Sequence, residues 1–107
     1  MTRVEFFTQE DRITGFCVSG HSGYGEEGSD ILCAAISAAV NLTECIVNDV
    51  CGARAKVRVK EENPSITLTL PAACDDEDAV QAALSGLMVY LIGLRDDYSD
   101  YLEVLEV

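Results

Sequence analysis

The sequence predicts a two-layer α+β fold, in which two helices pack on a mostly antiparallel sheet in the order ββαββαβ. Three observations lead to this expectation. Short segments with alternating or β-branched apolar residues occur in pairs, with turn residues between them. Two longer segments repeat apolar residues at three- and four-residue steps, as amphipathic helices do. Hairpins separated by helices are typical of helices layered on an antiparallel sheet.

The first half of the chain supplies a hairpin and a helix. Thr2–Phe7 and Arg12–Ser19 are the predicted strands, with a turn at residues 9–11. The helix is expected from Asp30 to about Cys51, and Gly52 is a fitting C-terminal stop. Its predicted apolar stripe consists of Leu32, Ala35, Ile36, Ala39, Ile46 and Val50.

A second hairpin is predicted from Ala53–Lys60 and Ser65–Leu70, with a turn at residues 62–64. Its first strand directs four basic residues to one face: Arg54, Lys56, Arg58 and Lys60. They are either a patch for an acidic ligand or RNA, or a solvated face that pairs with neighbouring acids. The strongly negative chain and the lack of interleaved aromatics favour the solvated face.

The second helix begins at four acidic residues, 75–78, where the helix dipole favours negative charge, and it runs to about Arg95. The last strand is Tyr101–Val107. Between residues 79 and 94 the polar side chains are few: Gln81, Ser85 and Tyr90. A helix that is apolar on nearly every side needs a cover. Either the first helix covers one flank and the small residues Ala82, Gly86 and Gly93 fill the rest, or the helix forms an interface between two copies of the chain. We favour the interface and expect a homodimer.

Composition narrows the class of protein. The 107 residues, 49% of them hydrophobic, suit one domain over residues 1–107. Seven Lys and Arg against 19 Asp and Glu give a net charge of −12, which argues against direct nucleic-acid and membrane-surface binding and favours a basic partner. The charged N-terminus is not a signal peptide, and no apolar run approaches the ~18 residues of a spanning helix. Five cysteines without a C-x-x-C pair indicate reduced thiols and a cytoplasmic location.

The loop from Gly20 to Gly28 contains four glycines in nine residues. Its glycines at 23, 25 and 28 match the G-x-G-x-x-G pattern of dinucleotide-binding loops. However, Glu26 and Glu27 would face the pyrophosphate, and the preceding strand belongs to a hairpin and not to a βαβ unit. Phosphate binding is therefore disfavoured.

Cys33 and His21 are the residues best suited to chemistry. His21, the only histidine, lies in the glycine-rich loop, and Cys33 lies in the first turn of the helix that Ser29 or Asp30 caps. Free N–H groups and the positive dipole end favour a thiolate there, and an imidazolium would favour it further. Cys33 also lies on the polar stripe of this helix, with Ser37, Asn41, Glu44 and Asn48. The pair suits nucleophilic catalysis, although each residue alone is more often structural.

Asp30 has two alternative roles. Asp30 either orients the imidazole of His21 or caps the helix, and capping is slightly favoured. The other cysteines are less suited: Cys17 is in the middle of a strand, Cys45 and Cys51 lie deep in the helix or at its end, and Cys74 precedes the acidic start of the second helix without a histidine nearby.

Gly20-His21, the glycine-bearing spacer, Asp30, Cys33-Ala34 and Ser37 form the pattern G-H-x(8)-D-x-x-C-A-x-x-S. In this pattern, and in its ββαββαβ order over the whole chain, the sequence resembles the ribosomal-processing cysteine protease family, Prp. The resemblance implies a catalytic dyad of His21 and Cys33, with Asp30 and Ser37 in support. It also implies a homodimer and a mobile substrate loop that includes Gly20, Ser22, Gly23, Gly25 and Gly28. Ser22 departs from the family, which usually has Ala after the histidine.

The resemblance implies a cysteine endopeptidase that removes a short N-terminal extension from the twenty-seventh large-subunit ribosomal protein. The expected partner is therefore a basic ribosomal protein precursor, and no metal or cofactor is implied. Backbone N–H groups at the start of the helix are the expected oxyanion donors. The alternative is a noncatalytic, ribosome-associated peptide-binding module in which Cys33 is incidental.

Overall fold

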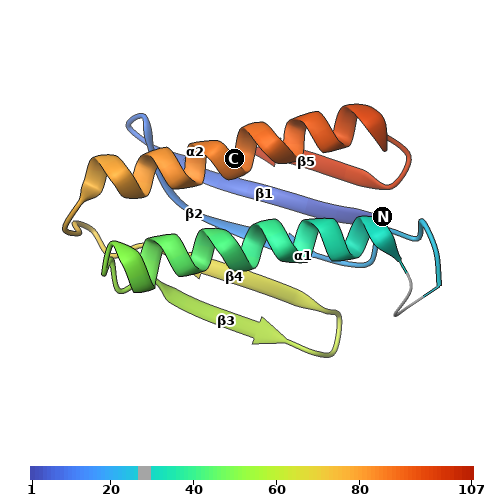
Figure 1. The fold of residues 1–107 in the computed structure, drawn as a ribbon, viewed down its shortest axis with the longest axis horizontal. Helices are drawn as coiled ribbons and strands as arrows, with labels where there is room; N and C mark the ends of the chain where they lie inside the picture. The colour runs from blue at the N-terminus through green and yellow to red at the C-terminus, as the bar shows by residue number, and fades with distance from the viewer. Residues whose placement is uncertain (27–29) are drawn as a thin grey trace.

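Two helices lie on one face of a five-stranded sheet (Figure 1). The computed structural model describes residues 1–26 and 30–107. Along the chain the elements are β1 (Thr2–Gln9), β2 (Arg12–Ser19), α1 (Ile31–Glu44), the π-helical segment η1 (Cys45–Val50), β3 (Lys56–Lys60), β4 (Ser65–Thr69), α2 (Glu77–Asp97) and β5 (Leu102–Glu106). The predicted α+β class and the ββαββαβ order are confirmed.

The sheet has the strand order β3-β4-β2-β1-β5. All neighbouring pairs are antiparallel except β1 and β5, which run parallel. The register places Phe6 opposite Phe16, and Phe16 opposite Leu68. All three side chains are almost fully buried, so this row forms the centre of the core beneath the helices.

The first hairpin turns at Glu10 and Asp11, whose φ angles of 52° and 64° produce the tight reversal that suits twisted strands. A bulge between Phe7 and Thr8 interrupts the ladder just beyond it. There the side chain of Gln81, on α2, bonds both backbone groups of Ile13 at 2.8 Å. Gln81 was predicted only as one of the few polar residues of its helix, and it instead fastens that helix to β2.

The first helix continues from α1 into η1 and ends before Gly52, whose φ of 66° fits the predicted stop. The prediction that Val50 belongs to the apolar stripe facing the core is wrong, because its side chain is 76% exposed. A π-helical turn contains more residues than an α-helical one. The change of pitch after Glu44 therefore rotates Val50 away from the sheet, and Val47 is buried in its place.

The third strand begins at Lys56, three residues later than predicted. The side chain of Asn48 bonds both the N–H and the C=O of Ala55, at 2.8 and 3.1 Å, so neither group is free for a strand ladder. Arg54 has a φ of 61°, which is incompatible with an extended strand. Asn48 is thus a structural residue, although the sequence placed it only on a polar stripe.

The start of α2 agrees in part with the expectation of four dipole-stabilising acids, because two of them, Glu77 and Asp78, lie in its first turn. The helix begins at Glu77, whose carboxylate forms an ion pair with Arg12 of β2 and accepts a hydrogen bond from the Cys74 thiol. Arg12 also donates to the carbonyl of Pro71 at 2.9 Å. These contacts join the helix start to the sheet, so one of the four acids has a specific structural partner.

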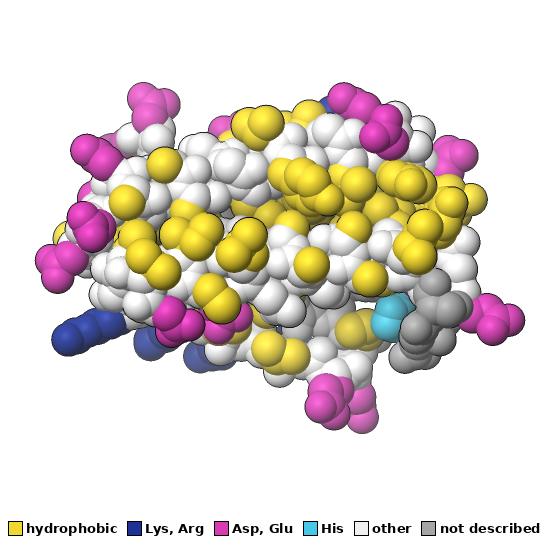
Figure 2. All heavy atoms as spheres, in the orientation of Figure 1, with side chains coloured by type: hydrophobic (Ala, Val, Ile, Leu, Met, Phe, Trp, Pro, Cys, Tyr) yellow, Lys and Arg dark blue, Asp and Glu magenta, His cyan; other side chains and the backbone are white. Residues whose placement is uncertain are grey.

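Basic residues on β3 do not pair with acids as the solvated-face interpretation proposed. Within the described part of the chain, the ion pairs are Arg12–Glu77 and Arg95–Asp96. The four basic side chains of this hairpin are all exposed, and Figure 2 shows Lys and Arg gathered along one border of the molecule.

Both helices are long and apolar enough to cross a membrane by length and composition alone, over Ile31–Val50 and Glu77–Asp97. This corrects the expectation that the chain holds no such segment. The same test is passed by core helices of globular proteins, and both helices contribute core residues here, including Leu32, Ile36, Leu84 and Leu91.

The face between the two helices is apolar and open. Figure 2 shows hydrophobic side chains spread across both helices. A groove of about 500 Å³ runs between them. It is lined mostly by small and apolar residues: Ala35, Ala38, Ala39, Leu42, Thr43, Ile46, Ala83, Gly86, Leu87 and Tyr90. On α2, the helix predicted to form a subunit interface, the large side chains of Val89 and Tyr90 are 70% and 49% exposed, and Tyr90 lines the groove.

Candidate active site

Asp30 organises the start of α1. Its Oδ1 accepts hydrogen bonds from the N–H groups of Leu32 and Cys33, both at 3.0 Å, so it is the N-cap of the helix. This settles the question that the sequence left open in favour of capping. The alternative cap, Ser29, lies outside the described residues.

The second carboxylate oxygen of Asp30 faces the glycine-rich loop. It accepts hydrogen bonds from the hydroxyl of Ser22 and from the N–H of Gly25, the latter at 3.3 Å. The Ser22 bond, together with backbone donors, outweighs burial and lowers the pKa of Asp30 to about 2. A buried carboxylate anion therefore ties the loop to the helix.

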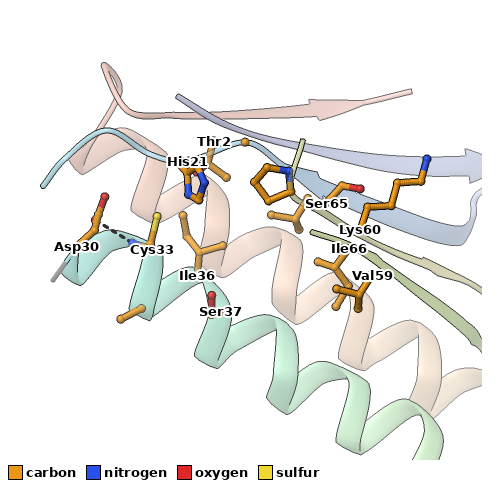
Figure 3. A pocket seen from close by; sticks show the side chains of 14 residues that line it. Thr2, His21, Asp30, Cys33, Ile36, Ser37, Val59, Lys60, Ser65 and Ile66 are labelled. Atoms are coloured by element: carbon orange, nitrogen blue, oxygen red, sulfur yellow. Dashed lines mark hydrogen bonds between the residues drawn. The ribbon is translucent and has the colours of Figure 1, made fainter. Parts of the chain in front are cut away.

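Cys33 and His21 face one cavity of about 520 Å³ (Figure 3). Cys33 is half-buried in the first turn of α1, and His21 is exposed on the loop just after β2. In the close-up view the sulfur and the imidazole ring both lie at the same end of the cavity. The structure thus brings together the two residues that the sequence selected as a nucleophile and a base.

The thiol itself is held by Ser22. The Ser22 N–H donates to the Cys33 sulfur, and the thiol donates to the Ser22 hydroxyl oxygen, both at 3.4 Å. Ser22 is only 2% exposed. The sequence placed this residue in the substrate loop, but nothing in the sequence pattern indicated its direct contact with the candidate nucleophile.

The expectation that free N–H groups at the helix start would act as oxyanion donors is wrong for residues 32–34. Asp30 occupies them: its side chain accepts from Leu32 and Cys33, and its carbonyl accepts from Ala34 at 3.1 Å. The capping that makes Asp30 useful to the fold therefore removes these donors from the site. Among the residues that the structure describes, Ser22 provides the backbone N–H that donates to the Cys33 sulfur.

Some of the predicted supporting and loop residues line the cavity, and others do not. Ser37, one turn beyond Cys33, and Gly20 both line it. Gly23 and Gly25 belong to the loop but are not among its lining residues, and Gly28 lies outside the described residues. Gly20 and Gly23 have φ angles of 80° and 75°, which only glycine adopts readily.

The opposite wall of the cavity comes from the β3–β4 hairpin, which sequence reasoning did not assign to the site. Val59, Lys60, Pro64, Ser65 and Ile66 line it there. Figure 3 shows Val59, Lys60, Ser65 and Ile66 across from the Cys33 end of α1. The alternating apolar pattern of the hairpin predicted a strand face, but no signal in the sequence linked that face to the loop.

Tyr24 anchors the loop at its far side. Its ring makes edge contacts with the rings of Tyr98 and Tyr101, with centroids 5.2 Å apart in each case. The loop is thereby braced by Asp30 at one point and by the turn before β5 at another.

The other cysteines are in different surroundings. All five are free thiols. Burial, and next the neighbouring Glu77 carboxylate, raise the pKa of Cys74, which opposes thiolate formation. Cys17 accepts a hydrogen bond from Thr67 in the sheet at 3.3 Å, and Cys45 is exposed at the start of η1. These settings agree with the choice of Cys33.

Comparison with known proteins adds independent information. A sequence model of the family described as Cysteine protease Prp matches residues 1–103. The ribosomal processing cysteine protease Prp of Bacillus subtilis (strain 168) is 28% identical over 94 residues, which cover 86% of this chain and 84% of that protein.

Solved structures share the whole fold. The S. aureus ribosomal processing protease Prp in complex with a covalently linked product peptide aligns with a TM-score of 0.90 at 20% identity, over all of both chains. The same protease in complex with a substrate peptide aligns with a TM-score of 0.85 at 18% identity, again over all of both chains.

A cysteine and a histidine that share an open cavity, on this fold and with these relatives, define a cysteine protease. Within that class, the match over residues 1–103 shows that the chain belongs to the Prp family of ribosomal processing cysteine proteases.

Proposed function

We propose that the protein is an endopeptidase that removes the N-terminal extension of the twenty-seventh large-subunit ribosomal protein, with Cys33 as nucleophile and His21 as base. The observation that carries this proposal is the meeting of both side chains in one cavity at the capped start of α1. The finer substrate assignment follows from the resemblance to a family whose Bacillus subtilis member is named for ribosomal processing.

The reaction uses the residues of the cavity in a fixed order. An imidazole nitrogen of His21 takes the thiol proton, and the sulfur of Cys33 attacks the scissile carbonyl. The N–H of Ser22 is the proposed donor to the oxyanion, because it already reaches the sulfur. His21 then protonates the leaving amine, and water hydrolyses the acyl-enzyme that remains.

The cavity suits an extended peptide. It is open and runs from the loop to the β3–β4 hairpin, with apolar floor residues such as Ile36 and Ile66. A segment lying in it would place side chains on both sides of the attacked carbonyl. We propose cleavage after an apolar or aromatic residue of a basic precursor in the cytoplasm, where the five thiols stay reduced.

We further propose that the chain acts as a homodimer through the apolar groove between α1 and α2. The exposed Leu42 and Tyr90, which both line the groove, support this proposal, because large apolar side chains gathered on one face are typical of subunit contacts.

The proposed function is tested with a synthetic peptide that spans the extension and the first residues of the mature ribosomal protein. Mass spectrometry of the products should show a single cut. Cys33→Ala and His21→Ala should each lower kcat by at least about a thousandfold. Cys45→Ala, which removes an exposed thiol outside the cavity, is the matched control and should cleave at the wild-type rate.

Two outcomes would contradict the proposal. Wild-type protein that binds the peptide without cutting it would support the noncatalytic peptide-binding module instead. A folded Cys33→Ala variant that still cuts at the wild-type rate would show that another group is the nucleophile. Circular dichroism of each variant separates loss of chemistry from loss of the fold.

A further inference from the structure

The resting position of the Cys33 proton is determined by Ser22. Within residues 1–26 and 30–107, the sulfur makes two hydrogen bonds with Ser22, one from its N–H and one to its hydroxyl oxygen, and the Asp30 carboxylate lies beside the thiol as a second acceptor. The imidazole of His21 lines the same cavity but forms no hydrogen bond within those residues. The thiol proton is therefore directed to the serine and not to the histidine.

The Ser22 hydroxyl can act toward the sulfur only as an acceptor. A hydroxyl carries one proton and two lone pairs. Its proton goes to the Asp30 carboxylate, while its lone pairs accept from the N–H of Tyr24 at 3.2 Å and from the Cys33 thiol. Because the pKa of Asp30 is about 2, the carboxylate stays ionised throughout the neutral range and continues to accept the hydrogen bond from the Ser22 hydroxyl. Lone pairs aimed at the sulfur stabilise a thiol and repel a thiolate.

We propose that Ser22 is a positioning residue that holds Cys33 as a protonated thiol in the resting enzyme. Catalysis then requires the thiol to exchange its bond with Ser22 for one with His21. In that step the S–H bond breaks and an N–H bond forms on the imidazole, so the proton is conserved and no further reactant is needed. The inference rests on the proposed function only in taking Cys33 as the nucleophile.

Ser22→Ala isolates this effect, because alanine keeps the backbone N–H and removes only the hydroxyl. The titratable and charged groups that line the cavity with Cys33 are His21, Asp30 and Lys60, and the substitution leaves all three in place. The loop also keeps its bond from Gly25 to Asp30. A change in the ionisation of the Cys33 thiol in this variant is therefore attributed to the loss of the Ser22 hydroxyl as a hydrogen-bond acceptor.

The experiment measures the rate of Cys33 alkylation by iodoacetamide between pH 5 and 9. Digestion after glutamate releases the segment 28–44, in which Cys33 is the only cysteine, so its labelling can be read by mass spectrometry. The midpoint of the pH profile should fall by about half a pH unit in Ser22→Ala, as the loss of one modest hydrogen bond predicts. At pH 6 the rate should rise about twofold, since a more acidic thiol is also a weaker nucleophile. Ser85→Ala, an exposed serine on α2, should follow the wild-type profile.

Asp30→Asn provides a second, independent variant. Asparagine still caps helices, and its amide can donate to the Ser22 oxygen, which frees the hydroxyl proton for the sulfur. Its midpoint should also fall, and by more than that of Ser22→Ala, because the substitution removes the carboxylate charge beside the thiol as well as the acceptor role of the Ser22 hydroxyl. Ser22→Gly, which also keeps the backbone N–H and removes the hydroxyl, keeps the test decisive if Ser22→Ala does not fold.

An unchanged or raised midpoint in folded Ser22→Ala, or in Ser22→Gly if Ser22→Ala is unfolded, overturns the proposal. Alkylation does not depend on peptide cleavage. A lowered midpoint in a protein that cuts no peptide would therefore refute the proposed function alone, while normal cleavage with an unshifted midpoint would refute only the role of Ser22.

Discussion

Gly20 lies so close to the backbone carbonyl of Met1 that a Cβ at position 20 would come within 2.7 Å of the Met1 oxygen. The contact joins the first residue of the chain to the start of the loop that carries His21. The φ angle of Gly20, 80°, is a second reason why this position requires glycine. The placement of the candidate base therefore depends on a backbone approach that no other residue permits.

Gly20→Ala should destabilise the protein by about 2 kcal/mol or more, because it combines a left-handed backbone with a steric clash. Gly52→Ala is the matched control: its φ is 66°, but a Cβ there meets nothing within 4 Å, so it should cost only about 1 kcal/mol. Urea denaturation followed by circular dichroism compares the two. Equal losses would show that the Met1 contact has no energetic weight.

Stability should fall at acid pH through two carboxylates. The pKa of Asp30 is lowered to about 2 mainly by Ser22, and that of Glu77 to about 2 mainly by the Arg12 hydrogen bond. A folded pKa below the unfolded value stabilises the protein above about pH 4.5, and this contribution is lost as the pH falls toward 2. The urea midpoint should accordingly drop between pH 5 and pH 2.5.

The variant Glu77→Gln tests the share of one carboxylate. It should be less stable than wild type at pH 7, and its urea midpoint should depend less on pH between 5 and 2.5. Asp78→Asn, an exposed neighbour in the same helical turn, serves as the control and should keep the wild-type pH dependence. If Glu77→Gln and wild type lost stability in parallel, the ion pair with Arg12 would not contribute.

The oligomeric state tests the groove between the helices. Light scattering at micromolar concentration should give twice the mass of one chain for wild type. Tyr90→Glu places a charge in the groove and should yield the monomer, since an unpaired charge is costly in an apolar contact. Ser85→Glu adds the same charge on the same helix outside the groove lining, and it should remain dimeric. A monomeric wild type would exclude the proposed interface.

Ionic strength should change the rate of peptide cleavage. The net charge of −12 attracts a basic substrate over long distances, and salt screens that attraction within about 10 Å at 0.1 M. Raising the salt from about 0.02 to 0.3 M should lower kcat/KM severalfold for a basic peptide, chiefly through slower encounter. A peptide with glutamine in place of its Lys and Arg should show little salt dependence, and equal slopes for both peptides would exclude steering.

The features that could be predicted from the sequence are those that depend on residues close together in the chain. The bounds of β2 were correct because alternation over Arg12–Ser19 is a short-range property. The cap at Asp30 and the stop at Gly52 were also recognisable, since each acts on backbone groups within a few residues. His21 and Cys33 could be paired from the sequence because only 12 positions separate them.

The remaining features depend on contacts between distant segments. Gln81 meets Ile13 only once α2 has packed on the sheet, and a polar side chain on an apolar helix gives no indication of its partner. The cavity wall at Val59 and Ile66 likewise arises from the folding of a separate hairpin against α1. Ser22 was visible as a departure from the family pattern, but its contact with the thiol depends on how the loop closes over Asp30.

The parallel pairing of β1 with β5 has a consequence for the order in which the protein can be made. The backbone N–H of Thr2 donates to the carbonyl of Tyr101 at 2.9 Å, and the ring of the loop residue Tyr24 contacts the rings of Tyr98 and Tyr101. A ribosome synthesises these tyrosines long after it has synthesised His21 and Cys33. The nascent chain thus contains His21 and Cys33 before it contains the two tyrosines that hold the loop through Tyr24. The site can be fully assembled only after Tyr101 has been translated.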